Sequence, residues 1–207
     1  MLISYKEKNG NLPAYKNHNC NIIKVRILRL IMIRHEQVDM LWNKKYNSST
    51  YDLACNKYDE CPIVLSSKRY SKIDDTKTVY ISELSRTYET ACRLFKKRNF
   101  FKTALLNEVP LKSFKDTNKM YPLWLWNFMG RFQWFLQNDR QAESKTETIM
   151  RDKRMIKLLE EHQEDCYLIT HGFYMRVFIK ELKKRGYTIK NNNFFGISNL
   201  DMIVAIK

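Results

Sequence analysis

Short apolar runs alternate with longer amphipathic stretches along this chain. The runs predict strands at residues 24–33, 78–81, 101–106, 166–170 and 202–206. The stretches between them carry apolar residues at helical spacing and predict helices at residues 49–58, 85–95, 145–163 and 173–184. Strands that alternate with helices are typical of an α/β domain with a largely parallel sheet.

Polar residues mark where several of these helices begin. Ser144 and Glu147 fit a capping box, in which each side chain bonds the backbone N–H of the other residue. Ser85 is the expected cap of the helix at residues 85–95, and Ser48 or Ser49 that of the helix at residues 49–58.

The aromatic stretch at residues 123–136 is apolar on nearly every face, so its periodicity does not orient it. A helix of this kind is usually buried, and we expect it to belong to the core. Two alternatives are a cap over a pocket and a segment that lies on a membrane surface.

Polar residues with chemical potential follow the predicted strands directly. Arg34 and His35 end the first strand, residues 83–86 follow the second, Glu108 follows the third and His171 follows the fourth. Because the carboxyl ends of parallel strands meet at one edge of a sheet, these groups should collect there, where ligands bind in such folds. Arg34 and His35 alone could simply end a strand in solvent.

Composition limits the partners more than the fold. The 207 residues suggest one domain, residues 23–207, preceded by a loosely ordered tail at residues 1–22. The net charge of +15 favours anionic partners such as nucleic acid, an acidic membrane or phosphorylated small molecules, although a basic surface can also serve solubility alone.

The cysteines indicate a reducing compartment. They are Cys20, Cys55, Cys61, Cys92 and Cys166, an odd number with no C-x-x-C pair. The chain also shows neither the apolar block of a signal peptide nor a membrane-spanning run. We therefore expect a cytoplasmic protein without a membrane partner.

Several short motifs, in order along the chain, resemble those of the histidine phosphatase superfamily, which contains phosphoglycerate mutases and many small phosphatases. Residues 30–36 (LIMIRHE) resemble its strand ending in Arg-His-Gly, and residues 82–91 (SELSRTYETA) resemble its Ser-x-Leu-x-Arg-Ala-x-Gln-Thr-Ala segment. Residues 106–108 (LNE) resemble its Leu-x-Glu segment, and residues 170–172 (THG), with Arg176, its final His-Gly motif. Glu143 and Ser144, with Arg151, are similar to a weaker Glu-Ser helix start.

The resemblance implies a three-layer α/β/α sandwich like that of phosphoglycerate mutase, with residues 109–165 supplying a helical cap over the site. It also implies a nucleophile, His35, that is transiently phosphorylated on a ring nitrogen. Arg34, Arg86 and, when protonated, His171 should lower the pKa of His35 and keep its lone pair available.

The resemblance assigns further roles around that nucleophile. Arg34 and Arg86 are the phosphate ligands, and His171 is a further donor to the transferring group. Glu108 is the general acid, which should be partly buried or lie near another carboxylate. The helix after Gly172 can add partial positive charge from its N-terminus.

Two charged residues of the motifs, Glu36 and Arg176, lie outside the proposed catalytic set. Glu36 stands where the family has glycine, so it should be paired by a cation or should disfavour highly charged substrates. For Arg176 we expect a structural ion pair with Glu83 or Glu36 rather than a substrate contact.

Neither a metal nor another cofactor is expected, because two arginines and two histidines supply the positive charge that magnesium supplies elsewhere.

The leading functional hypothesis is a phosphomonoester hydrolase that acts on a small phosphorylated metabolite or a phosphoprotein. A phosphoglycerate mutase-type phosphotransferase is the first alternative. It is disfavoured because two phosphates need two cationic clusters, and the segment between Glu108 and His171, which includes Arg131 and Arg140, shows no arginine-rich pattern. The second alternative is a non-catalytic basic binding module, with RNA or an acidic protein as its partner. Nucleic acid is disfavoured because aromatic residues interleave poorly with the lysine clusters. The sequence does not determine the oligomeric state.

Overall fold

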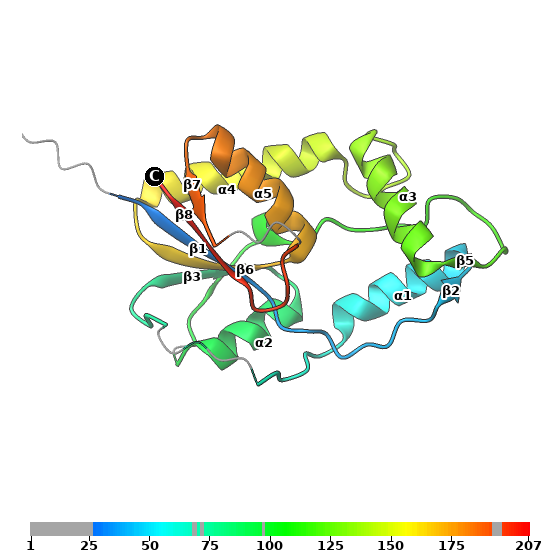
Figure 1. Cartoon of the computed structure of the whole chain (residues 1–207), viewed down its shortest axis with the longest axis horizontal. Coiled ribbons are helices and arrows are strands. Elements are labelled where there is room, and N and C mark those ends of the chain that lie inside the picture. Colours follow the sequence, from blue (N-terminus) through cyan, green and yellow to red (C-terminus); the bar gives the residue numbers. More distant parts are fainter. Residues whose placement is uncertain (1–26, 68–69, 71–72, 97, 192–195) are drawn as a thin grey trace, which may run out of the picture.

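A computed structural model describes residues 27–67, 70, 73–96, 98–191 and 196–207 of the chain (Figure 1). The predicted tail at residues 1–22 lies outside these residues. Figure 1 shows a sheet with helices above and below it, and a second group of helices to the right.

The central sheet has six strands in the order β4–β3–β6–β1–β8–β7. In that order the strands are Phe101–Lys102, Thr78–Ile81, Cys166–Thr170, Arg29–Arg34, Met202–Ile206 and Thr188–Lys190. The first four are parallel to one another, and β8 is antiparallel to both of its neighbours. The sheet is therefore mostly parallel, as predicted.

Strand β1 shows how the two faces of the sheet are covered. Leu30 and Met32 pack with residues of α4 (Lys145–His162) and α5 (Gly172–Lys184) on one face. Ile31 and Ile33 pack with α2 (Ser85–Leu94) on the other. Successive side chains of a strand point to opposite faces, so a strand that is apolar throughout needs a helix layer on each side. The three-layer prediction is confirmed.

The third predicted strand is shorter than expected. Only Phe101–Lys102 pair in the sheet, and residues Ala104–Leu106 form a 3-10 helix, η1. The Thr103 side chain accepts a hydrogen bond from the backbone N–H of Leu105, which turns the chain at this point. Strand β7 was not predicted from the sequence, because three residues of which two are exposed leave no readable pattern.

The helix caps were predicted in part. The capping box of Ser144 and Glu147 is present at the start of α4. Helix α1 (Ser48–Glu60) is instead capped by Asn47, whose side chain accepts a hydrogen bond from the N–H of Thr50. Helix α2 has Leu84 at the cap position, so Ser85 is its first residue rather than its cap.

A second group of elements, which we call the outer lobe, consists of α1, β2 (Lys45–Tyr46), β5 (Tyr121–Pro122) and α3 (Leu123–Phe135). Its small core is aromatic. Tyr51 stacks on Trp126 with ring centroids 5.2 Å apart, and Trp126 Nε1 donates a hydrogen bond to the carbonyl of Tyr46. Aromatic packing of this kind joins segments that are far apart in the sequence, here residues around 46–54 and 126.

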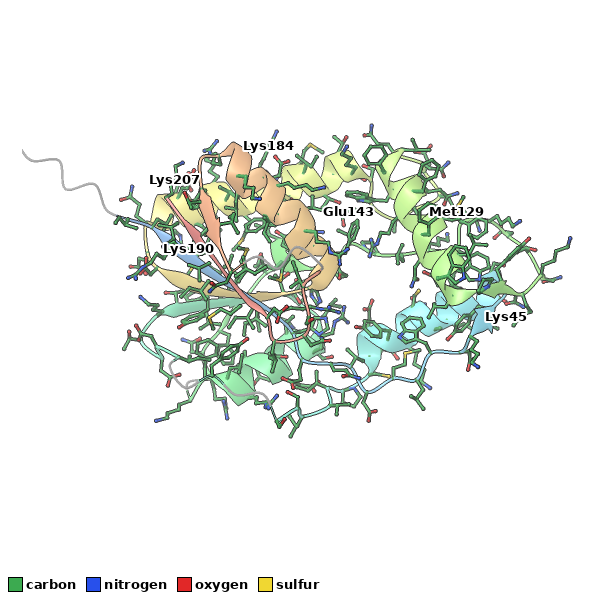
Figure 2. The ribbon with its side chains drawn as sticks, in the orientation of Figure 1. Lys45, Met129, Glu143, Lys184, Lys190 and Lys207 are labelled. Carbon is green, nitrogen blue, oxygen red and sulfur yellow. The ribbon has the colours of Figure 1, made fainter. Side chains whose placement is uncertain are left out.

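Helix α3 is not the core helix that its composition predicts. Trp126 and Trp134 are buried, but Trp124 and Phe128 are 67% and 61% exposed. Figure 2 shows α3, which carries the labelled Met129, at the edge of the outer lobe. Among the residues that the structure describes, no helix is both long and apolar enough to cross a membrane.

Candidate active site

The parallel pairing of β1 and β6 brings the two predicted histidines together. Arg34 is paired with Thr170, so His35 and His171 each follow at the same level of the sheet. Their ring centroids are 5.0 Å apart. Strand β3 brings a further residue to the same edge of the sheet. Ile81 is paired with Ile169, so Ser82 lies next to Thr170.

His35 is held in one tautomer. Its Nδ1 lies 2.5 Å from the carbonyl oxygen of Glu36, an acceptor, so Nδ1 carries the proton and Nε2 keeps a lone pair. The side chain is only 2% exposed. Burial, followed by the charge of Arg86 and then that of Arg34, lowers the pKa of His35 to about 3. The imidazole is therefore neutral at physiological pH.

His171 is fully buried and bonded at both ring nitrogens. Its Nδ1 accepts a hydrogen bond from Nε of Arg86, and its Nε2 lies 2.8 Å from Oγ of Ser82. Burial, together with the nearby His35 and Arg86, lowers the pKa of His171 well below its usual value. His171 is thus neutral in this structure, and it does not lower the pKa of His35 by carrying a charge.

Arg34 packs directly against the start of α5. A Cβ atom added at Gly172 would lie 3.0 Å from Nε and 3.1 Å from Cζ of Arg34. Only glycine at this position allows so close an approach. Arg34 Nη1 donates to the carbonyl of Ile197, whereas its buried Nε has no hydrogen-bond partner among the residues that the structure describes.

Arg86 is almost completely buried and has a partner that the sequence did not predict. Its Nη1 donates to Oδ1 of Asp59 at 2.8 Å, and its guanidinium lies 5.0 Å from the ring centroid of Tyr58. Both partners belong to the last turn of α1, in the outer lobe. A carboxylate at the C-terminal end of a helix opposes the helix dipole, and this unfavourable placement was the available signal that Asp59 has a cationic partner elsewhere.

Glu108 is half-buried, as expected, and it is fixed by the first turn of α5. Its Oε1 accepts hydrogen bonds from the N–H groups of Val109 and Tyr174, and its Oε2 accepts one from Phe173 at 3.3 Å. The N-terminus of α5 therefore binds this carboxylate. The sequence-based expectation directed its positive charge at the phosphate instead.

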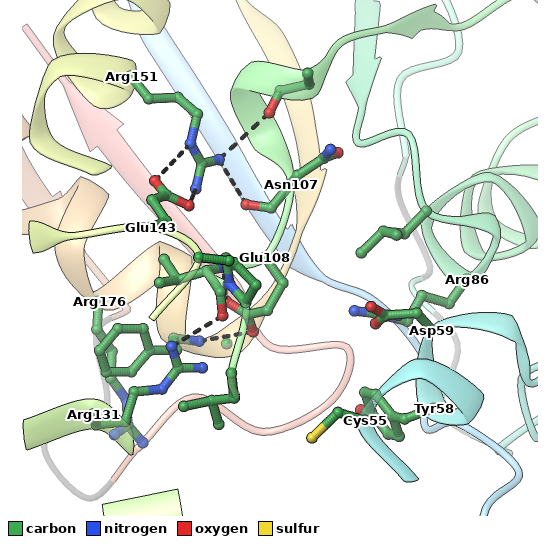
Figure 3. Close-up of a pocket in the computed structure, with 18 of the residues that line it drawn as sticks. Cys55, Tyr58, Asp59, Arg86, Asn107, Glu108, Arg131, Glu143, Arg151 and Arg176 are labelled. Carbon is green, nitrogen blue, oxygen red and sulfur yellow. Dashed lines mark hydrogen bonds and ion pairs between the residues drawn. The ribbon is translucent and has the colours of Figure 1, made fainter. Parts of the chain in front are cut away.

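Arg151 positions the loop that carries Glu108. It forms an ion pair with Glu143 and donates to the carbonyl oxygens of Ala104, Leu105 and Asn107 (Figure 3). Glu143 and Arg151, which the sequence showed only as part of a weak motif, therefore act together to hold this loop.

These groups border a cavity of about 1080 Å³ between the sheet and the outer lobe. Arg34, Arg86, Glu108 and Gly172 line it, while His35 and His171 lie behind this lining. Of the described residues, no group of three or more histidine, cysteine, aspartate or glutamate side chains has an arrangement that could hold a metal ion.

Comparison with known proteins assigns the family. The sequence profile of the histidine phosphatase superfamily (branch 1) matches residues 30–204. The chain belongs to this superfamily. No curated protein matches it by sequence.

Solved structures with a similar fold include three hydrolases or phosphatases. A mycobacterial protein named hydrolase 2 has 16% identity and a TM-score of 0.48, over 77% of this chain and 74% of that one. A mycobacterial glucosyl-3-phosphoglycerate phosphatase has 17% identity and a TM-score of 0.45, over 77% and 81%. A variant of phosphoserine phosphatase from Entamoeba histolytica, in complex with phosphoserine, has 15% identity and a TM-score of 0.48, over 76% and 80%. The family assignment rests on the profile match alone.

This member of the superfamily accommodates Glu36 by turning its side chain away from the histidines. The carboxylate is buried, forms an ion pair with Arg93 of α2 and accepts a hydrogen bond from the N–H of Ser66. The Glu36 N–H donates to Oγ1 of Thr90. Glu36 is therefore paired by a cation, the first of its two expected outcomes.

The predicted structural ion pair of Arg176 is absent. Glu36 forms its ion pair with Arg93, and Glu83 accepts a hydrogen bond from Asn107. Arg176 is exposed, lines the cavity and has no acidic partner among the described residues. Arg131 of α3 also lines the cavity, whereas Arg140 bonds Asp116 and Ser113 elsewhere. Arg131 from the outer lobe and Arg176 from α5 thus line the cavity together.

Proposed function

We propose that this protein is a phosphomonoester hydrolase that works through a phosphohistidine on His35. One observation carries the proposal: a neutral imidazole whose Nδ1 proton is held by the Glu36 carbonyl, with Nε2 free as a nucleophile beside two arginines. A nucleophile needs an available lone pair at working pH, and this environment supplies it.

Arg34 and Arg86 would bind the oxygens of the transferring group. Forked guanidinium donors suit phosphate, and phosphoryl transfer depends mainly on positioning and on stabilisation of charge. The unpartnered Nε of Arg34 is a donor for this purpose. His171 would join them as a further donor once one of its ring nitrogens exchanges its present partner for the substrate.

Glu108 would act first as an acid and then as a base. In the first step a bond forms between Nε2 of His35 and phosphorus, the ester P–O bond breaks, and Glu108 gives its proton to the leaving oxygen. In the second step water attacks phosphorus, the N–P bond breaks, and Glu108 takes a proton from the water. The residue lines the cavity, as do both arginines of the proposed site.

The substrate is a small phosphorylated metabolite or a phosphoprotein. A phosphotransferase of the mutase type stays the second candidate, and the structure adds an observation in its favour. Arg131 and Arg176 supply the second cationic cluster whose absence argued against it. Transfer to a second alcohol instead of water would distinguish the two activities.

Turnover of p-nitrophenyl phosphate tests the proposal. We expect wild-type protein to release p-nitrophenol and the His35→Ala variant to lose at least about 1000-fold in kcat/KM, because the covalent route is lost. Brief incubation with substrate, followed by quenching in base, should leave a phosphate on His35 that is stable to base and labile to acid.

Two controls complete this test. His162, a histidine outside the proposed site, provides the matched control, because His162→Ala should retain turnover. Equal inactivity of wild-type and His35→Ala protein from pH 5 to 8 would reject the enzyme and favour the alternative of a basic binding module.

A further inference from the structure

The cavity contains more arginines than its carboxylates can neutralise. Six arginines and four carboxylates line it: Arg34, Arg86, Arg131, Arg151, Arg154 and Arg176, with Asp59, Glu108, Glu143 and Glu147. Each carboxylate already has a partner. Asp59 pairs with Arg86, Glu143 pairs with Arg151, Glu108 accepts bonds from α5, and Glu147 bonds Ser144.

Arg131 is held in place without an ion pair to any of the described residues. Its guanidinium lies 3.7 Å from the ring centroid of Phe173, and Nη1 donates to the carbonyl of Val109. Within the described chain this is its only hydrogen bond, so the other N–H groups of its fork remain available. Burial lowers the pKa of Arg131, and the charge of the nearby Glu108 offsets this only in part. A largely buried guanidinium without a counter-ion is unfavourable unless an anion binds there.

Arg176 extends the same cluster. It lies three residues after Phe173 on α5, so Phe173 and Arg176 project from one side of the helix. A Cβ atom added at Gly196 would lie 3.4 Å from Nη2 of Arg176, and the next residue, Ile197, binds Arg34. Figure 3 shows Arg131 and Arg176 together, on the opposite side of the view from Arg86 and Asp59.

The cavity is also far larger than a phosphate group requires, since its volume of about 1080 Å³ is that of a pocket for a complete small molecule. From these observations we infer that Arg131 and Arg176 form a second anion site, and that the substrate carries a carboxylate or a second phosphate besides the group that is hydrolysed. This inference rests on the proposed function for the first phosphate site.

Two aryl phosphates of nearly the same shape test the inference: 4-carboxyphenyl phosphate and its neutral analogue 4-carbamoylphenyl phosphate. We expect wild-type protein to prefer the carboxylate about 10- to 100-fold in kcat/KM, the range for one or two charge-assisted hydrogen bonds. Benzene-1,4-diyl bisphosphate provides the second arm. The better of these two probes, each of which carries a second anionic group, identifies that group as carboxylate or phosphate.

Variants assign that preference to the two arginines. Arg131→Gln and Arg176→Gln should each reduce the ratio of the two kcat/KM values at least fivefold. Lys180→Gln removes the same charge one turn further along α5, from a residue outside the cavity lining, and should keep the ratio. Arg176 is exposed, so its variant decides the matter even if Arg131→Gln folds poorly. A wild-type ratio near 1 in both arms, or an unchanged ratio in Arg176→Gln, overturns the inference.

Binding to the His35→Ala protein separates this inference from the proposed function. Calorimetry should show tighter binding of 4-carboxyphenyl phosphate than of 4-carbamoylphenyl phosphate, by the same factor. Such a preference without any wild-type turnover rejects the hydrolase and keeps the second anion site. Turnover without a preference keeps the hydrolase and rejects the second anion site.

Discussion

The two walls of the cavity are built in different ways. The sheet wall carries Arg34 and Arg86, whose neighbours are the ends of paired strands. The outer-lobe wall carries Arg131 and Asp59, whose positions depend on helices packed through aromatic rings. On the sheet wall the positions follow from hydrogen-bond register, and in the outer lobe they follow from side-chain packing.

The two walls also differ in which of their charged side chains are paired. The two walls meet where Asp59, from the outer lobe, binds Arg86, from the sheet wall. A lobe carboxylate therefore occupies a donor that the proposed phosphate site needs, while Arg131 and Arg176 have no acidic partner in the described structure. In the proposed function, the sheet wall would supply the reacting groups, and Asp59 and Arg131 of the outer lobe would adjust how much anionic charge the site accepts.

The largest effect should come from the packing of the outer lobe. Trp126→Ala removes a fully buried ring and should lower the free energy of unfolding by about 3–5 kcal/mol. Trp124→Ala, two residues earlier and 67% exposed, should change it by less than about 0.5 kcal/mol. Urea denaturation measures both, and similar losses in the two variants would contradict the packing described here.

The next largest effect concerns the sheet wall. Glu108→Gln cannot donate or accept a proton, so kcat/KM for an alkyl phosphate should fall about 100-fold. For p-nitrophenyl phosphate, whose leaving group needs no proton, the loss should be much smaller. Equal losses with both substrates would mean that Glu108 only positions α5 and its N-terminal loop.

A smaller effect is expected where the walls meet. Asp59→Asn removes a charge that competes with phosphate for Arg86, so KM for p-nitrophenyl phosphate should fall about tenfold. Glu60→Gln is the matched control, because Glu60 is the next residue and is exposed. A higher KM in Asp59→Asn would show that the carboxylate positions Arg86 for the substrate.

The smallest effect should come from behind the sheet wall, at Asp152 of α4. Its carboxylate is buried beside the hydroxyl group of Tyr174, and burial raises the pKa of Asp152 to about 8. Between about pH 4 and pH 8 the folded protein therefore holds a proton that the unfolded chain has released, so this group lowers stability as the pH rises through that range.

Asp152→Asn removes this dependence. Relative to wild type, its free energy of unfolding should increase as the pH rises from 5 to 8, because the neutral amide has no proton to lose. Thermal unfolding at both pH values measures this difference. Asp139→Asn, at an exposed position, is the control and should show no such dependence. If the free energies of unfolding of Asp152→Asn and wild type differed by the same amount at both pH values, the raised pKa of Asp152 would be rejected.

The pattern of the sequence was sufficient for much of the fold. Strands at residues 78–81, 166–170 and 202–206 have the predicted bounds, because each is a short apolar run with polar residues at both ends. Parallel pairing then brought His35 and His171 together. The sequence did not show that residues 104–106 form a 3-10 helix, since that turn depends on one side chain, Thr103.

The environments of helix α3 and of Arg176 differ from those that the sequence predicts. The composition of α3 is that of a buried helix, yet Trp124 and Phe128 are exposed, because the small outer lobe can cover only one face. For Arg176 the sequence offered two acidic partners. Each of these acids bonds another group, Glu36 with Arg93 and Glu83 with Asn107, and Arg176 lines the cavity.

The sequence by itself determined the residues that end the parallel strands, because alternation and strand length are local properties of the chain. It therefore determined that two histidines, two arginines and a glutamate could meet at one edge of the sheet. Only the tertiary structure decided which charges remain unpaired there. Asp59 binds Arg86 across 27 residues, and Arg131 stacks on Phe173 of another helix. Such contacts depend on how helix faces pack, and no local pattern of residues contains that information.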